Sequence, residues 1–394
     1  MGTITLKGMT WSHPRGYDPM VACVQDWHAR TGVAIEWDKR SLQDFESFPV
    51  EDLARRYDLI VIDHPHVGQI TAEDCLAPLD LPGREAAFTA LACGSVGLSF
   101  PSYNWQDRQW AFPVDAATQV LAFRPDRLVV APRSWAEVVD LAKAGEMLLP
   151  LRPPHSLMCL FTLCGNLSRP CSVERDVPFV DVEIGVQAIE MIRELAAFTD
   201  PACTEMDPIA VLDRMGEAGS HYSVSPLIYG YVSYALAGFR ENRIAFADMP
   251  VAGGAGPVGS ALGGTGIAVS AFSAHRKVAV DFAYWIAAGQ QQAGRYWQTG
   301  GQPGHAAGWE DEAANAATLG FYRNTRRTLE GAWLRPRHDG YMPFPEAASQ
   351  RINEAVTGRE PAARVITDLN ALFAKSFRRS DEAAIPAPVD PVFR

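Results

Sequence analysis

The order of strands and helices at the start of the chain constrains the fold most. The pattern predicts a strand over residues 3–11, a helix over 17–31 closed by Gly32, a second strand over 33–40 and a third over 57–63. Strands that alternate with helices through short connections are typical of a parallel α/β sheet. We therefore expect an α/β fold that begins with a strand–helix–strand unit.

Polar residues follow two of these strands directly. Trp11 and His13 stand at the end of the first strand, and Asp63, His64 and His66 stand at the end of the third. In parallel α/β sheets, ligands bind just beyond the carboxyl ends of the strands. Two polar groups that are distant in sequence should then share one rim, which favours contact with a ligand over the alternative of ordinary polar loops.

Histidines are frequent in predicted loops beside glycine or proline. Six of them follow this pattern: His13, His64, His66, His155, His305 and His338. None has the H-E-x-x-H spacing of a metalloprotease, although metal binding from distant loops and acid–base catalysis stay open as alternatives. Hydrogen bonding to a ligand is the favoured role, because a neutral imidazole offers one donor and one acceptor. We expect no metal and no cofactor.

A glycine-rich stretch over 249–271 contains a literal G-x-G-x-x-G at Gly254, Gly256 and Gly259. We reject a dinucleotide site, because Pro257 lies inside the motif and a strand rather than a helix follows it. These glycines instead allow a flexible crossing or a close approach of the backbone to a ligand.

Aromatic residues also occur among polar residues, glycine and proline. Tyr229 and Tyr231 lie in the segment SPLIYGYVSYA, and Trp11 precedes a serine and a histidine. Such rings stack on flat ligands or sugar faces while a polar edge stays free, and packing in the core is the alternative for each of them.

The composition of the chain limits the classes of partner and the cellular compartment that we expect. The formal net charge of the 394 residues is −11 and no block of lysine and arginine stands out, so we expect neither nucleic acid nor membrane insertion. No secretion signal is visible at the start of the chain, and the seven cysteines are irregularly spaced without a C-x-x-C. We expect reduced thiols and a cytoplasmic protein for the chain as written, or a periplasmic one if a signal has been removed.

Two long segments resemble the family 1 extracellular solute-binding proteins, the carbohydrate-type receptors of ABC importers. The first is AFPVDAATQVLAFRPDRL followed by PRSWAEVVDLAKA. Its matching positions are Pro113, Asp115, Thr118, Phe123, Arg124, Pro132, Ser134, Trp135 and Glu137. The second segment covers 262–305 and ends in the T-G-x-x-P turn of Thr299, Gly300 and Pro303. From capping residues and apolar spacing we also predict helices over 134–145, with a Ser134–Glu137 capping box, over 181–198, and over 273–289, capped by Ser273.

The resemblance implies a type II periplasmic-binding fold, in which two α/β lobes close around a ligand. We expect one lobe to contain residues 1–114 and about 255–310, and the other to contain 115–254 and about 311–380, with an extended tail over 381–394.

The function implied is binding of a small polar organic ligand, as the receptor of an ABC permease or as an intracellular binder. The ligand class implied is a sugar or a sugar-like metabolite, with a carboxylate as the other option through Arg15 and the histidines. The alternative is a cytoplasmic enzyme that uses His and Asp side chains of the cleft for acid–base chemistry. The residues that we expect to bind the ligand are Trp11, His13, Arg15, Asp63, His64, His66, Asp115, Thr118, His155, Tyr229 and Gly264.

Overall fold

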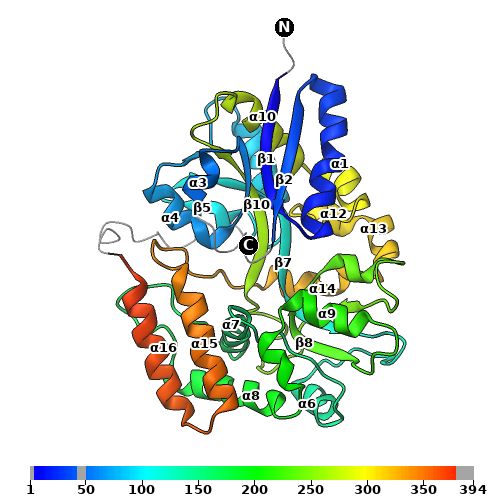
Figure 1. Cartoon of the computed structure of the whole chain (residues 1–394), viewed down its shortest axis with the longest axis vertical. Coiled ribbons are helices and arrows are strands. Elements are labelled where there is room, and N and C mark those ends of the chain that lie inside the picture. The colour runs from blue at the N-terminus through cyan, green and yellow to red at the C-terminus, as the bar shows by residue number, and fades with distance from the viewer. Residues whose placement is uncertain (1–3, 42–49, 379–394) are drawn as a thin grey trace.

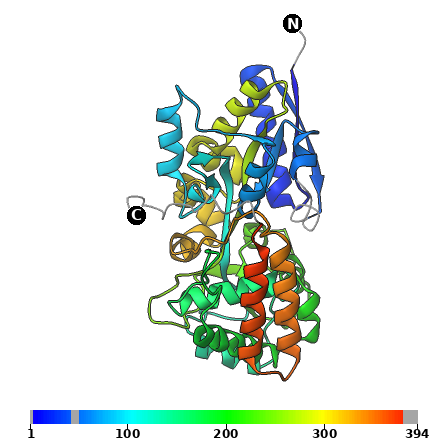
Figure 2. The same ribbon diagram turned by 90° about the vertical axis from the view of Figure 1, so that its left-hand side faces the viewer.

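The computed structural model describes residues 4–41 and 50–378 of the chain. It shows a mixed α/β protein with two lobes, one above the other in Figures 1 and 2, and confirms the predicted two-lobe fold. The sheet that runs through both lobes has the strand order β2-β1-β3-β10-β7-β8, with β4 added beside β10 and β9 beside β7. Its strands are β1 (Thr5–Trp11), β2 (Ala34–Arg40), β3 (Leu59–Asp63), β4 (Leu76–Ala77), β7 (Ala111–Phe123), β8 (Val224–Tyr229), β9 (Ala245–Ala247) and β10 (Leu262–Ser270).

The helices cover both lobes. Around β1–β3 and in the connections lie α1 (Pro14–Thr31), α3 (Val50–Ala54), α4 (Val67–Ala72), α5 (Glu85–Gly94), α10 (Arg276–Ala287), α11 (Gly289–Gln291), α12 (Ala306–Glu310), α13 (Glu312–Ala317) and α14 (Phe321–Glu330). The lower part of Figure 1 contains α6 (Trp135–Lys143), α7 (His155–Asn166), α8 (Val182–Ala196), α9 (Pro208–Gly216), α15 (Pro343–Thr357) and α16 (Ala362–Ser376). The C-terminal helices α15 and α16 pack on α7 and α8.

Short elements complete the chain. A two-stranded sheet joins β5 (Asn104–Trp105) and β6 (Arg108–Gln109). The 3-10 turns are η1 (His64–His66), η2 (Pro101–Tyr103), η3 (Pro201–Glu205) and η4 (Val232–Ala235), and the π-helical turn is η5 (Gln292–Tyr296).

The long strand β7 passes from one lobe to the other. Its first part, Ala111–Thr118, pairs antiparallel with β10, and its last part, Gln119–Phe123, pairs with β8 and β9. β10 lies between β7 and β3, and its Thr265 pairs with both Asp63 at the carboxyl end of β3 and Asp115 of β7. At that meeting point Gly264 has a φ of 99°, and a Cβ there would lie 2.3 Å from the carbonyl oxygen of Asp115. Glycine is therefore required where the two crossing strands come closest.

The start of the sheet confirms the prediction from sequence. β1 pairs in parallel with both β2 and β3. Helix α1, however, begins at Pro14, before the predicted start at residue 17, because proline suits the first helical position and the Nδ1 atom of His13 caps the helix. This cap is a hydrogen bond of 3.1 Å donated by the backbone N–H of Arg15.

The predicted caps of two later helices have different outcomes. α6 has the capping box, since the N–H of Ser134 donates to Glu137 Oε2 at 2.8 Å and the N–H of Glu137 donates to Ser134 Oγ at 3.4 Å. The prediction that Ser273 caps α10 is wrong. That helix begins at Arg276, and the hydroxyl of Ser273 instead donates to Asp58 Oδ1 at 2.5 Å. The carboxylate of Asp58, which precedes β3 and is 215 positions away in sequence, competes here for the serine, and the local sequence does not reveal it.

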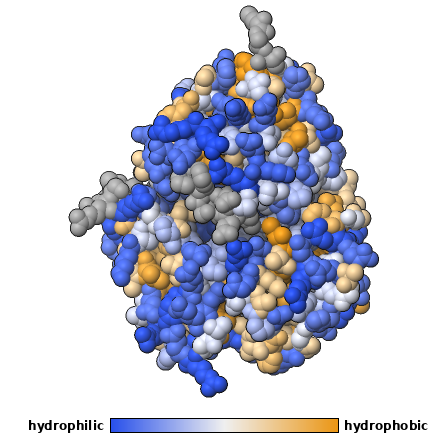
Figure 3. Space-filling view, viewed as in Figure 1, coloured by the Kyte–Doolittle hydropathy of each residue, from blue (hydrophilic) through white to orange (hydrophobic). Residues whose placement is uncertain are grey.

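Three further features concern the surface, the helices and the cysteines. Hydrophilic residues cover most of the face in Figure 3, and apolar residues occur there in separate groups. None of the described helices is both long and apolar enough to cross a membrane. All seven cysteines are free thiols; six are buried, and Cys93 is exposed. The predicted tail over 381–394 lies outside the described residues.

Candidate ligand-binding site

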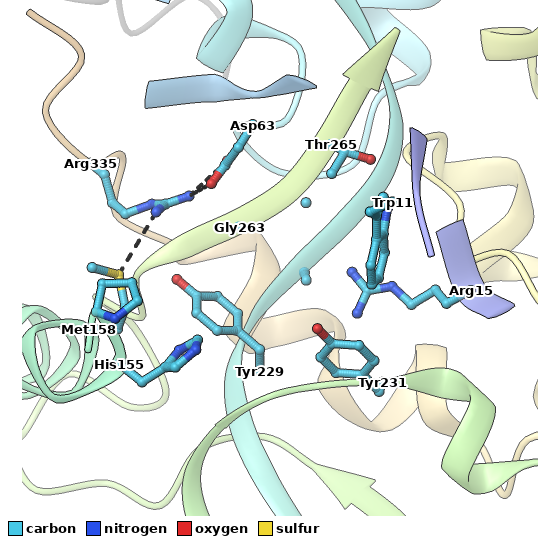
Figure 4. Close-up of a pocket in the computed structure, with 13 residues that line it drawn as sticks. Trp11, Arg15, Asp63, His155, Met158, Tyr229, Tyr231, Gly263, Thr265 and Arg335 are labelled. Carbon is cyan, nitrogen blue, oxygen red and sulfur yellow. Dashed lines mark hydrogen bonds and ion pairs between the residues drawn. The ribbon is translucent and has the colours of Figure 1, made fainter. Parts of the chain in front are cut away.

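A cavity of about 70 Å³ lies between the lobes where β7 and β10 cross, and we call it the chamber (Figure 4). Trp11, Asp63 and Tyr229 line it from the last positions of β1, β3 and β8, as the strand-end geometry predicts. The side chains that give it its chemistry are Trp11, Arg15, Asp63, His155, Tyr229, Tyr231, Thr265 and Arg335.

Three aromatic rings form walls of the chamber. Trp11 and Tyr231 are buried and meet edge to face, with ring centroids 6.1 Å apart. Tyr229 packs against the backbone of β10, where a Cβ on Gly263 would lie 2.7 Å from its ring. The glycines of β10 thus let an aromatic ring lie flat against the crossing strand. Aromatic faces with a polar edge suit the alternating apolar and hydroxylated surfaces of a sugar.

The guanidinium of Arg15 is held by a carboxylate from the crossing strand. Its Nε donates to Asp115 Oδ2 at 2.7 Å, its Nη2 donates to Asp115 Oδ1, and its Nη1 donates to the carbonyl of Gly230 at 2.9 Å. Arg15 and Asp115 are 3% and 2% exposed. Burial alone would lower the pKa of Arg15, but the Asp115 carboxylate outweighs it and the pKa is raised. Burial raises the pKa of Asp115, against the pull of the Arg15 guanidinium.

A second guanidinium on the other side of the chamber is also held by a carboxylate, here through a single nitrogen. Arg335 Nη2 donates to both carboxylate oxygens of Asp63 at 2.8 Å, and its Nε donates to the carbonyl of Leu262 at 2.9 Å. Burial would raise the pKa of Asp63, but Arg335 and His64 hold it well below its usual range. The remaining nitrogen, Nη1, contacts the sulfur of Met158 at 3.9 Å, which is a weak acceptor (Figure 4).

Two buried polar atoms of the chamber have no hydrogen-bond partner among the described residues. They are Nδ1 of His155 and Oγ1 of Thr265, from side chains that are 5% and 7% exposed. A buried polar atom without a partner costs roughly 1–3 kcal/mol, so both are suited to bind a polar ligand atom. Burial lowers the pKa of His155 to about 4, against the attraction of the Asp207 carboxylate, so at neutral pH its imidazole is uncharged.

The structure brings together part of the predicted site. The chamber is lined by Trp11, Arg15, Asp63, His155, Tyr229 and Gly264. The other predicted residues are not among the lining residues: His13, His64, His66, Asp115 and Thr118.

Three of these five residues have defined contacts outside the lining of the chamber. His13 caps α1 and stacks on Trp11 at 5.5 Å, and Asp115 holds Arg15. His64 is fully buried, with Nδ1 3.2 Å from Asp63 Oδ1. It therefore contacts the lining residue Asp63 but does not line the chamber itself. His66 and Thr118 are also buried. Contact of these residues with a ligand stays a prediction.

Sequence reasoning missed Arg335, Met158 and Thr265. Arg335 is 272 positions from Asp63, and among its neighbours only His338 has a predicted role. Local patterns do not reveal pairings across such distances. Among residues 4–41 and 50–378, no group of three or more His, Cys, Asp and Glu side chains is placed to hold a metal ion.

A family profile decides what kind of protein this is. The profile of bacterial extracellular solute-binding proteins matches residues 24–307, which is well over half of the chain. The chain belongs to this family. The predicted solute-binding function is thereby confirmed, and it is favoured over the alternative of an enzyme on the same fold. A search of curated protein sequences finds no significant match.

Solved structures show the same fold over nearly the whole chain. The maltose-bound MalE3 of T. maritima has a TM-score of 0.77 at 16% identity, and the match covers 94% of this chain and 99% of that one. An ABC transporter solute-binding protein of Agrobacterium radiobacter in complex with ribitol has a TM-score of 0.77 at 17% identity, covering 95% and 98%. A third, from Thermotoga lettingae and bound with α-D-tagatose, has a TM-score of 0.76 at 14% identity, covering 95% and 100%.

Proposed function

We propose that this solute-binding protein binds a neutral, polyhydroxylated molecule, a sugar or a sugar alcohol, in the chamber and leaves it chemically unchanged. The observation that carries the proposal is the pairing of both guanidiniums, Arg15 with Asp115 and Arg335 with Asp63. Buried cations that already have bidentate carboxylates leave no net charge for a ligand to neutralise. The aromatic walls and the two unpaired polar atoms supply stacking and hydrogen bonds for hydroxyl groups.

A carboxylate ligand is the weaker alternative. It would have to displace Asp115 or Asp63 from its arginine, and breaking a buried pair costs roughly 3–5 kcal/mol when the partner is lost. Three of the solved structures with this fold hold maltose, ribitol and tagatose, which are all neutral.

The size of the chamber implies that the lobes move. A cavity of about 70 Å³ is small beside the roughly 300–1,000 Å³ of typical ligand pockets. A sugar ring therefore enters after the lobes separate, and they close on it around the crossing strands β7 and β10. We propose the predicted division into lobes, 1–114 with about 255–310 and 115–254 with about 311–380, for the parts that move.

We propose an ABC permease as the macromolecular partner, because similar structures are described as ABC transporter solute-binding proteins. For the compartment we propose the periplasm, as the extracellular family favours it over the cytoplasmic prediction. Cys93, the exposed thiol, offers a test. A membrane-impermeant maleimide should label Cys93 in intact cells, and labelling only after lysis would support the cytoplasm.

Thermal unfolding with a panel of neutral sugars and sugar alcohols tests the proposed function. Maltose, ribitol and tagatose are the first probes. We expect at least one neutral compound to raise the midpoint in proportion to the logarithm of its concentration. A panel in which only charged compounds stabilise the protein would contradict the proposal.

A further inference from the structure

A second, larger cavity opens beside the chamber. It has a volume of about 950 Å³ and lies between α15, the loop before α7 and the turn η3; we call it the groove. A volume of this size is in the range that holds a drug-sized ligand. The chamber and the groove share the wall residues Asp63, Pro154, His155 and Arg335. A ligand that extends past His155 therefore passes from one into the other.

The groove carries an excess of negative charge. Five carboxylates and two guanidiniums line it, which leaves a net charge of −3. Asp63 is paired with Arg335, and Asp207 lies 3.8 Å from Arg152. The excess therefore resides on three other acids, Glu205, Glu346 and Glu354.

These three acids are exposed and weakly neutralised. Glu205 and Glu346 have no ion-pair partner within the described part of the chain. Glu354 lies 3.7 Å from Arg351, whose closer partners are Glu360 at 2.6 Å and Asp368 at 2.8 Å. Three carboxylates around one groove attract a cation, and the attraction is strongest for a cation that lies between them.

The deep end of the groove has buried polar atoms that a ligand can satisfy. Tyr341 is 1% exposed, and its hydroxyl has no hydrogen-bond partner among the described residues. His155 Nδ1, at the junction with the chamber, has none either. Burial raises the pKa of Tyr341, so its hydroxyl stays a neutral donor and acceptor. These two atoms are independent of the acidic residues and point to a polar ligand where the cavities join.

Helix α15 places polar side chains along one side of the groove. Glu346, Gln350, Asn353, Glu354 and Thr357 follow the spacing of one helix face, and all of them line it. The carboxylates of Glu346 and Glu354, about two turns apart on this polar row, can receive amines at more than one position of an elongated ligand.

We propose that the groove is a second subsite, which binds the amine-bearing part of a ligand whose neutral hydroxylated part lies in the chamber. The ligand class is thus a cationic oligosaccharide, with amines bound by Glu205, Glu346 and Glu354. This inference rests on the proposed function, because the chamber fixes the neutral end.

Calorimetric titration with two matched sets of oligosaccharides tests the inference. One set consists of glucosamine oligomers with one neutral, N-acetylated end unit and protonated amines on the other units, and the other consists of the same oligomers fully N-acetylated and neutral. Each exposed charge pair contributes a factor of roughly 1.5 to 5 in affinity. We expect the amine set to bind about tenfold more tightly than the acetylated set, with an advantage that shrinks as salt is added.

The triple variant Glu205→Gln, Glu346→Gln, Glu354→Gln should abolish the advantage and leave the affinity for the neutral set unchanged. Glu312→Gln, on α13 and away from the groove, is the matched control and should change neither. These acids are exposed, so the variants retain the fold.

The other possible results of these titrations would overturn the inference, and one of them would overturn the proposed function as well. Equal binding of both sets by the wild-type protein, or an advantage that survives in the triple variant, would overturn the inference and leave the neutral chamber intact. Binding of neither set, together with no response to the neutral sugar panel, would overturn the proposed function as well.

Discussion

The chamber and the groove share a wall, but within the described residues the charged side chains of the chamber are paired and several of those in the groove are not. In the chamber, Arg15 and Arg335 each have a bidentate carboxylate partner, and all four groups lie between the lobes. In the groove, Glu205 and Glu346 face solvent without a counter-charge among the described residues. The difference follows from burial, because an ion out of water must be paired and an exposed ion need not be. Of these two cavities, therefore, only the groove has charged side chains, unpaired within the described part of the chain, that can attract an ionic group of a ligand.

The largest expected effect comes from removing a carboxylate from the chamber. Asp115→Asn leaves the guanidinium of Arg15, 3% exposed, without its anion. We expect a loss of roughly 3–5 kcal/mol in the free energy of unfolding, measured by urea denaturation. Glu346→Gln in the groove is the control, and we expect a change within about 0.5 kcal/mol. Equal losses in the two variants would contradict the distinction between the regions.

The next effect concerns the aromatic wall. Tyr229→Ala removes the ring that lies against Gly263, and we expect binding of a neutral sugar to weaken by about 2 kcal/mol, or about 30-fold. Tyr229→Phe keeps the ring and should retain most of the affinity. Titration of both variants with the best neutral compound of the panel separates stacking from hydrogen bonding. An affinity equal to wild type in Tyr229→Ala would remove this ring from the binding site.

A smaller effect appears on acidification. Burial lowers the pKa values of His64 and His155 to about 4, below the unfolded value of 6.5. Between about pH 6.5 and about pH 4 the unfolded chain binds more protons, so stability falls as pH decreases through this window. We expect His64→Gln to reduce the slope of unfolding free energy by up to about 1.4 kcal/mol per pH unit. An unchanged slope in His64→Gln would contradict the burial argument.

Most of the fold could be predicted from the sequence. The parallel pairing of β1 with β2 and β3 follows from the order of strands and helices, and the α6 capping box follows from a three-residue spacing. Both are local patterns. The caps of α1 and α10 could not be predicted, because His13 is an unusual cap and Ser273 is bound by Asp58 from far along the chain.

The site could be predicted in part, for the same reason. Strand ends are visible in sequence, so Trp11 and Asp63 could be placed at the sheet edge that lines the chamber, and Tyr229 was predicted from its aromatic setting beside a glycine. Whether a residue such as His64 faces the chamber or the core depends on the turn that follows the strand, and here the 3-10 turn η1 buries it. Arg335 was missed because its role comes from a pairing with Asp63 across the cleft, which only the folded chain creates.

The central claim is that the chamber binds a neutral ligand because its own charges are paired. Calorimetric titration of the wild-type protein with a neutral sugar of the panel and with the sugar acid of the same skeleton tests it most directly. Since the acid would compete with Asp115 and Asp63 for buried arginines, we expect the neutral sugar to bind at least about tenfold more tightly. Tighter binding of the sugar acid would contradict the claim and would show that Arg15 or Arg335 releases its carboxylate to hold the ligand.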